Sequence, residues 1–306
     1  MKVLLTGATS GLGWSTAHAL VATGHEVTIL ARDDSKARSL AESVAEAHPD
    51  ANPVRWVRCD LADLASVAQA GRSLTEEPGG FDAIVMNAGL QVVNGIEYSA
   101  DGLELTMATN VLGHFLLYRL LRDRMPTGAR IITLGSETHR GGIRAWGFPG
   151  ALWSDPALLF YPPANAPRSS QAGRVRYSTS KLCSIYMAYE IDRREQPNEI
   201  RALAFDPGLM PATGLARDYP PIIRSIYSRI AGIVAKFPEA NTVDESADNL
   251  SWLATDPAAL ALGGKYVTHR SARPSSPLSY DTANAGALWD YCCQLIDPLI
   301  DTRDQG

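Results

Sequence analysis

The chain has 306 residues, of which 45% are hydrophobic and 20% charged, and its formal net charge is -5. These values are ordinary for a globular enzyme, and the acidic balance disfavours nucleic acid as a partner. No run of 18 apolar residues occurs and the N-terminus lacks a signal-peptide pattern, so we expect a cytoplasmic protein without a membrane-spanning helix. The four cysteines and six histidines show no metal-ligand or disulfide spacing, so no metal is expected.

Short apolar runs alternate with amphipathic stretches along the chain. We expect strands at 3–5, 27–30, 54–57, 83–86, 130–134, 200–205 and 265–268, and helices at 12–22, 35–47, 64–74, 103–122, 177–194 and 243–254. Strands that alternate with helices predict a parallel sheet covered on both faces, whose central strands are apolar throughout. The sequence therefore predicts one α/β domain over residues 1–306, with a doubly wound parallel sheet of about seven strands.

Two segments interrupt the alternation. Residues 137–173, which contain several glycines and prolines, are too long for an ordinary connection, and residues 209–240 are interrupted by prolines. We expect the first to be a lid insertion and the second a substrate-binding loop, and their aromatic residues favour a bulky apolar substrate. The candidate substrate residues are His139, Trp146, Trp153, Tyr219 and Tyr227. Alternatively, the two segments pack on each other or form a subunit contact.

A glycine-rich turn follows the first expected strand and opens a helix. Backbone N–H groups at such a helix N-terminus bind the pyrophosphate of a dinucleotide. The glycines allow the tight turn and the close approach of cofactor and helix to the sheet. The expected contacts are Gly7, Thr9, Ser10, Gly11, Leu12 and Gly13.

Arg32 stands at the end of the second expected strand. An arginine there suits the 2′-phosphate of NADP(H), whereas an acidic residue would bind the ribose hydroxyl groups of NAD(H). Asp33 and Asp34 follow directly and either complicate this choice or cap the next helix. The sequence favours NADP(H) over NAD(H).

Several short motifs occur together in one order. They are Thr6 to Gly13, Asp60-Leu61, Asn87-Ala88-Gly89, Asn110, Ser136, Tyr177 with Lys181, and Pro207-Gly208. As a set they resemble the short-chain dehydrogenase/reductase family. This resemblance implies a Rossmann-type fold, an NAD(P)-dependent oxidoreductase, and further cofactor contacts. Those contacts are Asp60, Leu61, Asn87, Ala88, Gly89, Tyr177, Lys181, Pro207, Gly208, Leu209 and Thr213.

The resemblance also implies roles in catalysis. Tyr177 would donate the proton, and Lys181, one helical turn away, would lower the pKa of its phenol and hold the nicotinamide ribose. Ser136 would bind the substrate oxygen, and Asn110 would organise a water that returns protons to Lys181. Cys183 is expected to face the core and His114 to be structural.

A closer likeness lies within the family. Residues 110–117, 180–183 and 207–215 resemble protochlorophyllide reductases and retinol-dehydrogenase-like enzymes. Leu209 stands where the protochlorophyllide enzymes have a functional cysteine, which favours a dark reductase. Three functions stay open: reduction of a ketone (or the reverse oxidation), reduction of a conjugated carbon–carbon double bond, and cofactor binding without turnover. Monomer and homodimer also stay open.

Overall fold

A computed structural model describes residues 1–76, 78–145, 147–208 and 241–300. Its sheet has eight strands in the order β3-β2-β1-β4-β5-β6-β7-β8. The strands are β1 (Lys2–Thr6), β2 (Glu26–Ala31), β3 (Arg55–Arg58), β4 (Ala83–Met86), β5 (Arg130–Leu134), β6 (Arg201–Asp206), β7 (Tyr266–Thr268) and β8 (Ser271–Arg273). All neighbouring strands are parallel except β8, which runs antiparallel to β7. The prediction of a doubly wound parallel sheet is confirmed, and β8 is an addition to it.

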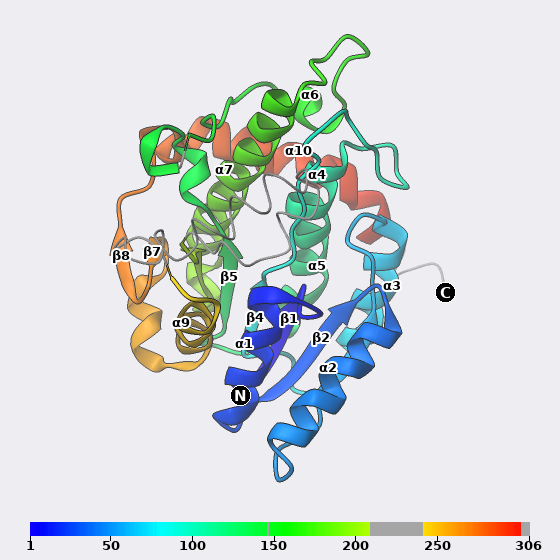
Figure 1. The fold of residues 1–306 in the computed structure, drawn as a ribbon, viewed down its shortest axis with the longest axis vertical. Helices are drawn as coiled ribbons and strands as arrows, with labels where there is room; N and C mark the ends of the chain where they lie inside the picture. Colours follow the sequence, from blue (N-terminus) through cyan, green and yellow to red (C-terminus); the bar gives the residue numbers. More distant parts are fainter. Residues whose placement is uncertain (77, 146, 209–240, 301–306) are drawn as a thin grey trace, which may run out of the picture.

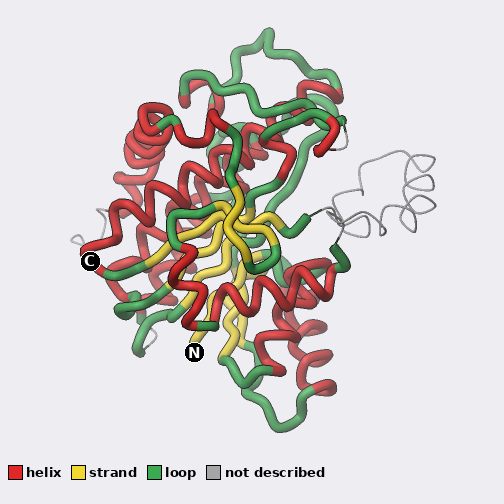
Figure 2. Tube along the Cα trace, turned by 90° about the vertical axis from the view of Figure 1, so that its left-hand side faces the viewer, coloured by secondary structure: helices red, strands yellow, loops and turns green. Residues whose placement is uncertain are grey.

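Helices cover both faces of the sheet (Figures 1 and 2). One face carries α1 (Gly11–Ala22), α2 (Asp34–Ala47) and α9 (Val243–Thr255), and the other carries α3 (Leu64–Thr75), α5 (Gly113–Leu121) and α7 (Ser170–Glu195). Side chains alternate between two separate cores along each strand, so that Leu4 packs under α3 and α5 while Leu5 packs under α1 and α9. Both are fully buried, as expected for a central parallel strand.

The long helix expected over residues 103–122 is divided into three parts. A turn of α-helix, α4 (Leu105–Met107), leads into a π-helical segment, η1 (Ala108–Leu112), and then into α5. The π-helical segment contains Asn110. Such segments often occur at functional sites because they redirect side chains that a regular helix would point elsewhere.

Helix α7 begins seven residues earlier than the sequence predicts. Ser169 is its N-cap and accepts a hydrogen bond from the N–H of Ala172 at 3.3 Å. The preceding residues, expected to form a lid, contain the 3₁₀ turns η3 (Glu137–His139) and η4 (Ile143–Ala145) and the short helix α6 (Pro156–Phe160). The substrate-binding loop expected at 209–240 lies outside the described residues.

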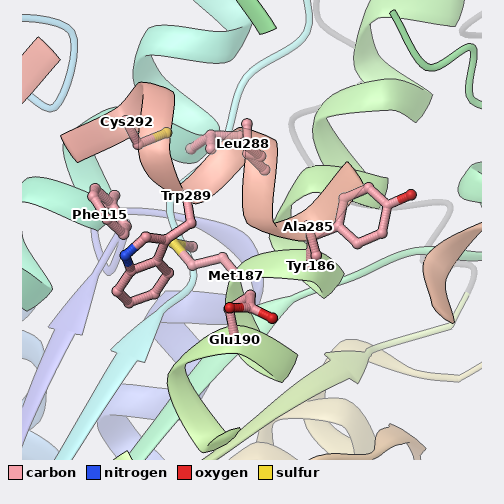
Figure 3. Close-up of a pocket in the computed structure, with 9 residues that line it drawn as sticks. Phe115, Tyr186, Met187, Glu190, Ala285, Leu288, Trp289 and Cys292 are labelled. Carbon is pink, nitrogen blue, oxygen red and sulfur yellow. The ribbon is translucent and has the colours of Figure 1, made fainter. Parts of the chain in front are cut away.

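A C-terminal helix that the sequence analysis did not predict, α10 (Thr282–Ile300), lies across α5 and α7 (Figure 1). Its Trp289 meets Phe115 edge to face at 4.9 Å, and the Arg194 guanidinium lies 4.4 Å from the Trp289 ring centre. A small apolar pocket remains between the three helices (Figure 3). No described helix has the length and apolar character needed to cross a bilayer.

Candidate active site

The motif residues meet at the carboxyl ends of β1, β4, β5 and β6. The strand order changes direction between β1 and β4, and ligands of open α/β sheets bind in the crevice at such a point. The pocket in Figure 3 lies elsewhere: it includes Met187 and Glu190 of α7, ten or more residues past Tyr177. The candidate site is therefore the group of residues at the strand ends.

The turn between β1 and α1 has no room for side chains at two glycines. Gly7 has a φ of +68°, and a Cβ there would lie 2.7 Å from the Cα of Ala88. A Cβ on Gly13 would lie 2.2 Å from the carbonyl oxygen of Gly7. The Asn87 amide nitrogen fastens this turn to β4 by donating to the carbonyl oxygens of Thr6 at 2.9 Å and Gly7 at 3.1 Å.

The N-terminus of α1 is prepared for an anion. Its N-cap residue, Ser10, makes no side-chain cap, and the first turn contains no acidic residue. By contrast, α2, α3 and α9 are capped by Asp33, Asp63 and Thr242. Uncapped N–H groups at the positive end of a helix dipole fit a dinucleotide pyrophosphate. Gly11 begins α1, and the Leu12 side chain is buried in the core, so that only its backbone could meet a ligand at this end of the helix.

Arg32 and its acidic neighbour Asp33 have different roles in the structure. The Asp33 carboxylate accepts hydrogen bonds from Ser35 Oγ at 2.7 Å and from the N–H groups of Ser35 at 3.0 Å and Lys36 at 3.3 Å. These bonds lower its pKa, the one from the Ser35 hydroxyl most. Asp33 is thus engaged in capping α2, and Arg32 is exposed at the end of β2. Asp60 and Leu61 follow the neighbouring strand β3, where the Asp60 carboxylate accepts from the Ala62 N–H at 3.0 Å.

Tyr177 and Lys181 lie together and are buried, each with 6% of its surface exposed. The Lys181 Nζ is 5.6 Å from the centre of the Tyr177 ring and donates to the Leu134 carbonyl oxygen at 3.0 Å. Burial lowers the pKa of the Lys181 ammonium to about 8, and the carboxylate of Asp206 partly opposes this shift. The structure thus places a buried cation beside the Tyr177 ring.

Asn110 joins three parts of the site. Its Oδ1 accepts from the Leu90 N–H at 2.8 Å, and its Nδ2 donates to the Leu90 carbonyl oxygen and to Ser180 Oγ, both at 3.0 Å. A Cβ on Gly89 would lie 3.3 Å from the Asn110 Oδ1 and 3.7 Å from the Lys181 Nζ. Gly89 therefore keeps open the space between these two polar groups.

His114 supports this arrangement from inside the core. Its Nδ1 donates to the carbonyl oxygen of Asn110 at 3.2 Å, and its Nε2 accepts from the Thr6 hydroxyl at 2.9 Å. Burial lowers the pKa of His114 to about 4, so the ring is neutral at pH 7. These contacts agree with a structural role. Cys183 is fully buried, in agreement with the expectation that it faces the core.

Ser136 directly follows Gly135 at the end of β5, and His139 holds its backbone. The His139 Nδ1 donates to the Ser136 carbonyl oxygen at 2.5 Å, and its Nε2 accepts from the Ser276 N–H at 2.9 Å. His139 is 3% exposed, and burial lowers its pKa to about 4. Because both ring nitrogens are engaged by the backbone, neither is left for the substrate contact that the sequence analysis expected.

Two aromatic residues of the 137–173 segment lie in different places: Phe148 lies at the candidate site, and Trp153 packs against the core. The ring centre of Phe148 lies 6.3 Å from that of Tyr177, and the Arg174 guanidinium lies 5.5 Å from the Phe148 ring centre. Trp153 instead packs edge-on against Tyr186 at 5.4 Å, nine residues further along α7. The expected cofactor and substrate residues Leu209, Thr213, Trp146, Tyr219 and Tyr227 lie outside the described residues.

Two further residues of the site were not recognised in the sequence. Asp206 ends β6, directly before Pro207-Gly208, and its carboxylate accepts a hydrogen bond from the Tyr266 hydroxyl at 2.6 Å. The position of Asp206 next to a motif was a signal that sequence reasoning had available. No local pattern marks Tyr266, because only the pairing of β6 with β7 brings it there.

Comparison with known proteins identifies the family. Residues 1–148 match the pattern that describes the family "short chain dehydrogenase". The chain is 31% identical to "Putative daunorubicin C-13 ketoreductase DnrU" of Streptomyces sp. (strain C5), over 94% of this chain and 90% of that protein. It is 30% identical to a chloroplastic protochlorophyllide reductase of Daucus carota, over 96% and 78% of the two chains.

Solved structures share the fold. A protein from Mycobacterium Paratuberculosis superimposes with a TM-score of 0.69 at 26% identity, over 97% of this chain and 93% of that one. A blue fluorescent protein from a metagenomic library, solved with NADPH, gives a TM-score of 0.62 at 24% identity, over 87% and 95%. The chain belongs to the short-chain dehydrogenase/reductase family and is an NAD(P)-dependent oxidoreductase.

The two buried histidines predict a loss of stability in mild acid. Their folded pKa values of about 4 lie below the ordinary 6.5, so the unfolded chain binds more protons between these limits. Their contribution is complete above pH 6.5 and is lost as the pH falls toward 4. Between pH 7 and pH 5 we expect each to remove about 2 kcal/mol from the free energy of unfolding.

Urea denaturation of the wild type and of His139→Asn at both pH values measures this contribution. The buried carboxyl groups titrate alike in the two proteins, so the difference isolates the histidine. An equal loss of stability in both proteins between pH 7 and pH 5 would contradict the assignment of a neutral, buried His139.

Proposed function

We propose that the protein is an NADPH-dependent ketoreductase (or the reverse alcohol dehydrogenase) that acts on a bulky hydrophobic carbonyl compound. The observation that carries this proposal is the burial of Tyr177 beside the Lys181 ammonium at the carboxyl end of the sheet. A proton donor with an electrostatic activator is what carbonyl reduction requires, and a protein that only binds a cofactor has no need of one.

The residues at the strand ends fit a bound dinucleotide. The turn at Gly7 and Gly13 and the uncapped end of α1 would hold the pyrophosphate, and Asn87 keeps this turn in place. Lys181 would hold the nicotinamide ribose. Arg32, exposed beside the capping residue Asp33, would bind the 2′-phosphate, so NADPH is favoured over NADH.

Each polar residue then has one task in the reaction. When bound, the reduced nicotinamide supplies the hydride. Ser136 donates a hydrogen bond to the carbonyl oxygen and stabilises the negative charge that develops there. Tyr177 gives its proton to the same oxygen, and Lys181 lowers the cost of the phenolate that remains. Asn110 is held by hydrogen bonds to Leu90 and Ser180, and it keeps its segment of helix in place beside Lys181. A water bound there would return a proton to Lys181.

The substrate class is inferred from an aromatic residue beside the proton donor. The Phe148 ring lies edge-on to Tyr177 and offers an apolar surface. An aromatic wall with a few directed polar groups is typical of sites for large apolar ligands. The Streptomyces relative, whose name is "Putative daunorubicin C-13 ketoreductase DnrU", is consistent with such a substrate.

A second candidate reaction is reduction of a conjugated carbon–carbon double bond. It is favoured by the 30% identity to a protochlorophyllide reductase, which nearly equals that to the ketoreductase. The two reactions differ in where the hydride arrives.

The test uses NADPH deuterated at its transferable position, with polycyclic aromatic ketones and matched enones as substrates. Ketone reduction places deuterium on the carbinol carbon, and double-bond reduction places it on a ring or chain carbon. We expect the first result. NADPH binding without turnover of any of these substrates would favour the binding-only function.

Replacing Arg32 with Ala tests the cofactor preference. Loss of a charge-assisted contact to the 2′-phosphate costs about 1.5–3 kcal/mol, so we expect Kd for NADPH to rise by roughly tenfold to a hundredfold. The Kd for NADH should stay the same, because NADH has no phosphate there. Fluorescence titration with both cofactors measures this, and Arg58→Ala, another exposed arginine at a strand end, is the control. A parallel loss of both affinities would assign Arg32 to the fold rather than to the phosphate.

A further inference from the structure

Close to Lys181, the protein buries the Asp206 carboxylate and the Tyr266 side chain, which are joined by a hydrogen bond. Asp206 is 3% exposed, and its Oδ1 accepts from the Gly208 N–H at 2.9 Å. Its Oδ2 accepts from the hydroxyl of Tyr266, which is 1% exposed, at 2.6 Å. A buried carboxylate is costly unless it is hydrogen-bonded, and here both oxygens have a donor.

Strand pairing places Asp206 and Tyr266 near Lys181. Lys181 donates to the Leu134 carbonyl oxygen, and Leu134 pairs across the sheet with Phe205, the residue before Asp206. The charge of Asp206 therefore acts on Lys181 from the neighbouring strand. Burial lowers the pKa of Lys181, Asp206 partly opposes this shift, and the resulting pKa is about 8. At this value a small change in the local field decides whether the lysine carries its charge at neutral to weakly basic pH.

We infer that Asp206, oriented by the Tyr266 hydroxyl, is a positioning residue that keeps Lys181 protonated during turnover. The inference rests on the proposed function, since it concerns the group that activates Tyr177. A neutral Lys181 would no longer stabilise the Tyr177 phenolate. The loss of Asp206 would therefore slow proton transfer, although Asp206 makes no contact with the substrate.

The other ionisable groups around the pair support this role. On the lysine side, Tyr177 lies on the same helix, and the His114 ring of α5 is neutral. On the far side, the Tyr266 hydroxyl lies 3.4 Å from Glu137 Oε1, and Glu137 pairs with Arg140 at 3.1 Å. Asp206 is thus the acidic neighbour that acts directly on Lys181.

The neutral His139 ring, 5.2 Å from that of Tyr266, completes the surroundings. Burial raises the pKa of Asp206, whereas the hydrogen bonds from Tyr266 and Gly208 lower it. Removing the Tyr266 hydroxyl should therefore let Asp206 take up a proton more readily. Tyr266→Phe and Asp206→Asn are expected to act on Lys181 in the same direction.

The test is a direct titration of Lys181 in the full chain. The protein has five lysines, so selective ¹³C labelling gives few ¹³Cε signals, and Lys181→Arg assigns the one of interest. Measurement in a Tyr177→Phe background removes the coupled titration of the tyrosine. We expect a midpoint near pH 8, lowered by about one pH unit in Asp206→Asn and by part of that in Tyr266→Phe. The basic limb of the reductive kcat/KM profile, measured with Tyr177 intact, should move down by the same amount.

Tyr118→Phe is the matched control, because the Tyr118 hydroxyl donates to the buried Glu195 carboxylate at the other end of α7. It should leave the Lys181 midpoint unchanged. An unchanged midpoint in both Asp206→Asn and Tyr266→Phe, each folded by circular dichroism, would overturn the inference. If Asp206→Asn does not fold, Tyr266→Phe alone decides. A shifted midpoint in a protein that turns over no ketone would support the inference while the proposed function fails.

Discussion

Replacing Tyr177 with Phe is expected to lower kcat/KM for ketone reduction by about 10²–10⁴, the usual contribution of a positioned general acid. The substitution removes the proton donor and keeps the ring that packs against Phe148. Since the pyrophosphate turn and Arg32 are unaffected, Kd for NADPH should change little. Steady-state kinetics with the ketone that turns over best, together with fluorescence titration of NADPH, measure both quantities.

Tyr186→Phe is the matched control for this prediction. It removes a hydroxyl from another buried tyrosine of the same helix, one that donates to the carbonyl oxygen of Leu278 at 2.7 Å. It should leave kcat/KM nearly unchanged. A Tyr177→Phe enzyme that retains full activity would show that the proton comes from another group, and the proposed mechanism would have to be abandoned.

Replacing Gly13 with Ala is expected to damage both the fold and cofactor binding. The new Cβ would lie 2.2 Å from the Gly7 carbonyl oxygen and 2.6 Å from the Asn87 amide nitrogen. Backbone atoms cannot move aside as a flexible side chain can, so the turn must shift. Overpacking of this kind costs about 1–3 kcal/mol, which urea denaturation would show as a lower free energy of unfolding.

Cofactor affinity should fall together with stability, since the shifted atoms belong to the turn that is proposed to hold the pyrophosphate. A loss of about 1.4 kcal/mol in binding raises Kd tenfold, and we expect at least this change for NADPH. Gly286→Ala is the control, because this glycine lies inside α10 with nothing within 4 Å of the added Cβ. That variant should be as stable as the wild type or slightly more stable, as helix propensity favours alanine. Unchanged NADPH binding in Gly13→Ala would remove this turn from the cofactor site.

Sequence reasoning recovered the parts of the protein that local chemistry encodes. The apolar runs at 83–86 and 130–134 are β4 and β5 in full, and the other expected strands differ from the observed ones by one residue at one or both ends. Tyr177 and Lys181 are one helical turn apart, so their proximity followed from the helix alone. The glycines of the first turn were recognised for the same reason, because backbone geometry there depends on a few adjacent residues.

Local sequence patterns predicted the helices less well than the strands. A continuous apolar periodicity predicted one helix over 103–122. The structure has a π-helical segment within this range, and the segment contains Asn110, which is hydrogen-bonded to Leu90 and Ser180. The start of α7 was missed because its first turns are polar and their cap, Ser169, lies within a loop-like sequence. Helix α10 was missed altogether, although its apolar side chains bury against α5 and α7 once these are in place.

The sequence by itself thus determined the family through its set of motifs, most of the strands, the glycine-rich turn and the pair of Tyr177 and Lys181, since each single motif or strand depends on residues close together in the chain. The tertiary structure decided which distant groups complete the site. It engaged both nitrogens of His139 with the backbone, brought Phe148 against Tyr177, and placed Asp206 and Tyr266 together near Lys181. Apart from the contact of His139 with Ser136, three positions away, these contacts join residues 29 to 137 positions apart. Their geometry arises from strand pairing and helix packing, which no local pattern of side chains specifies.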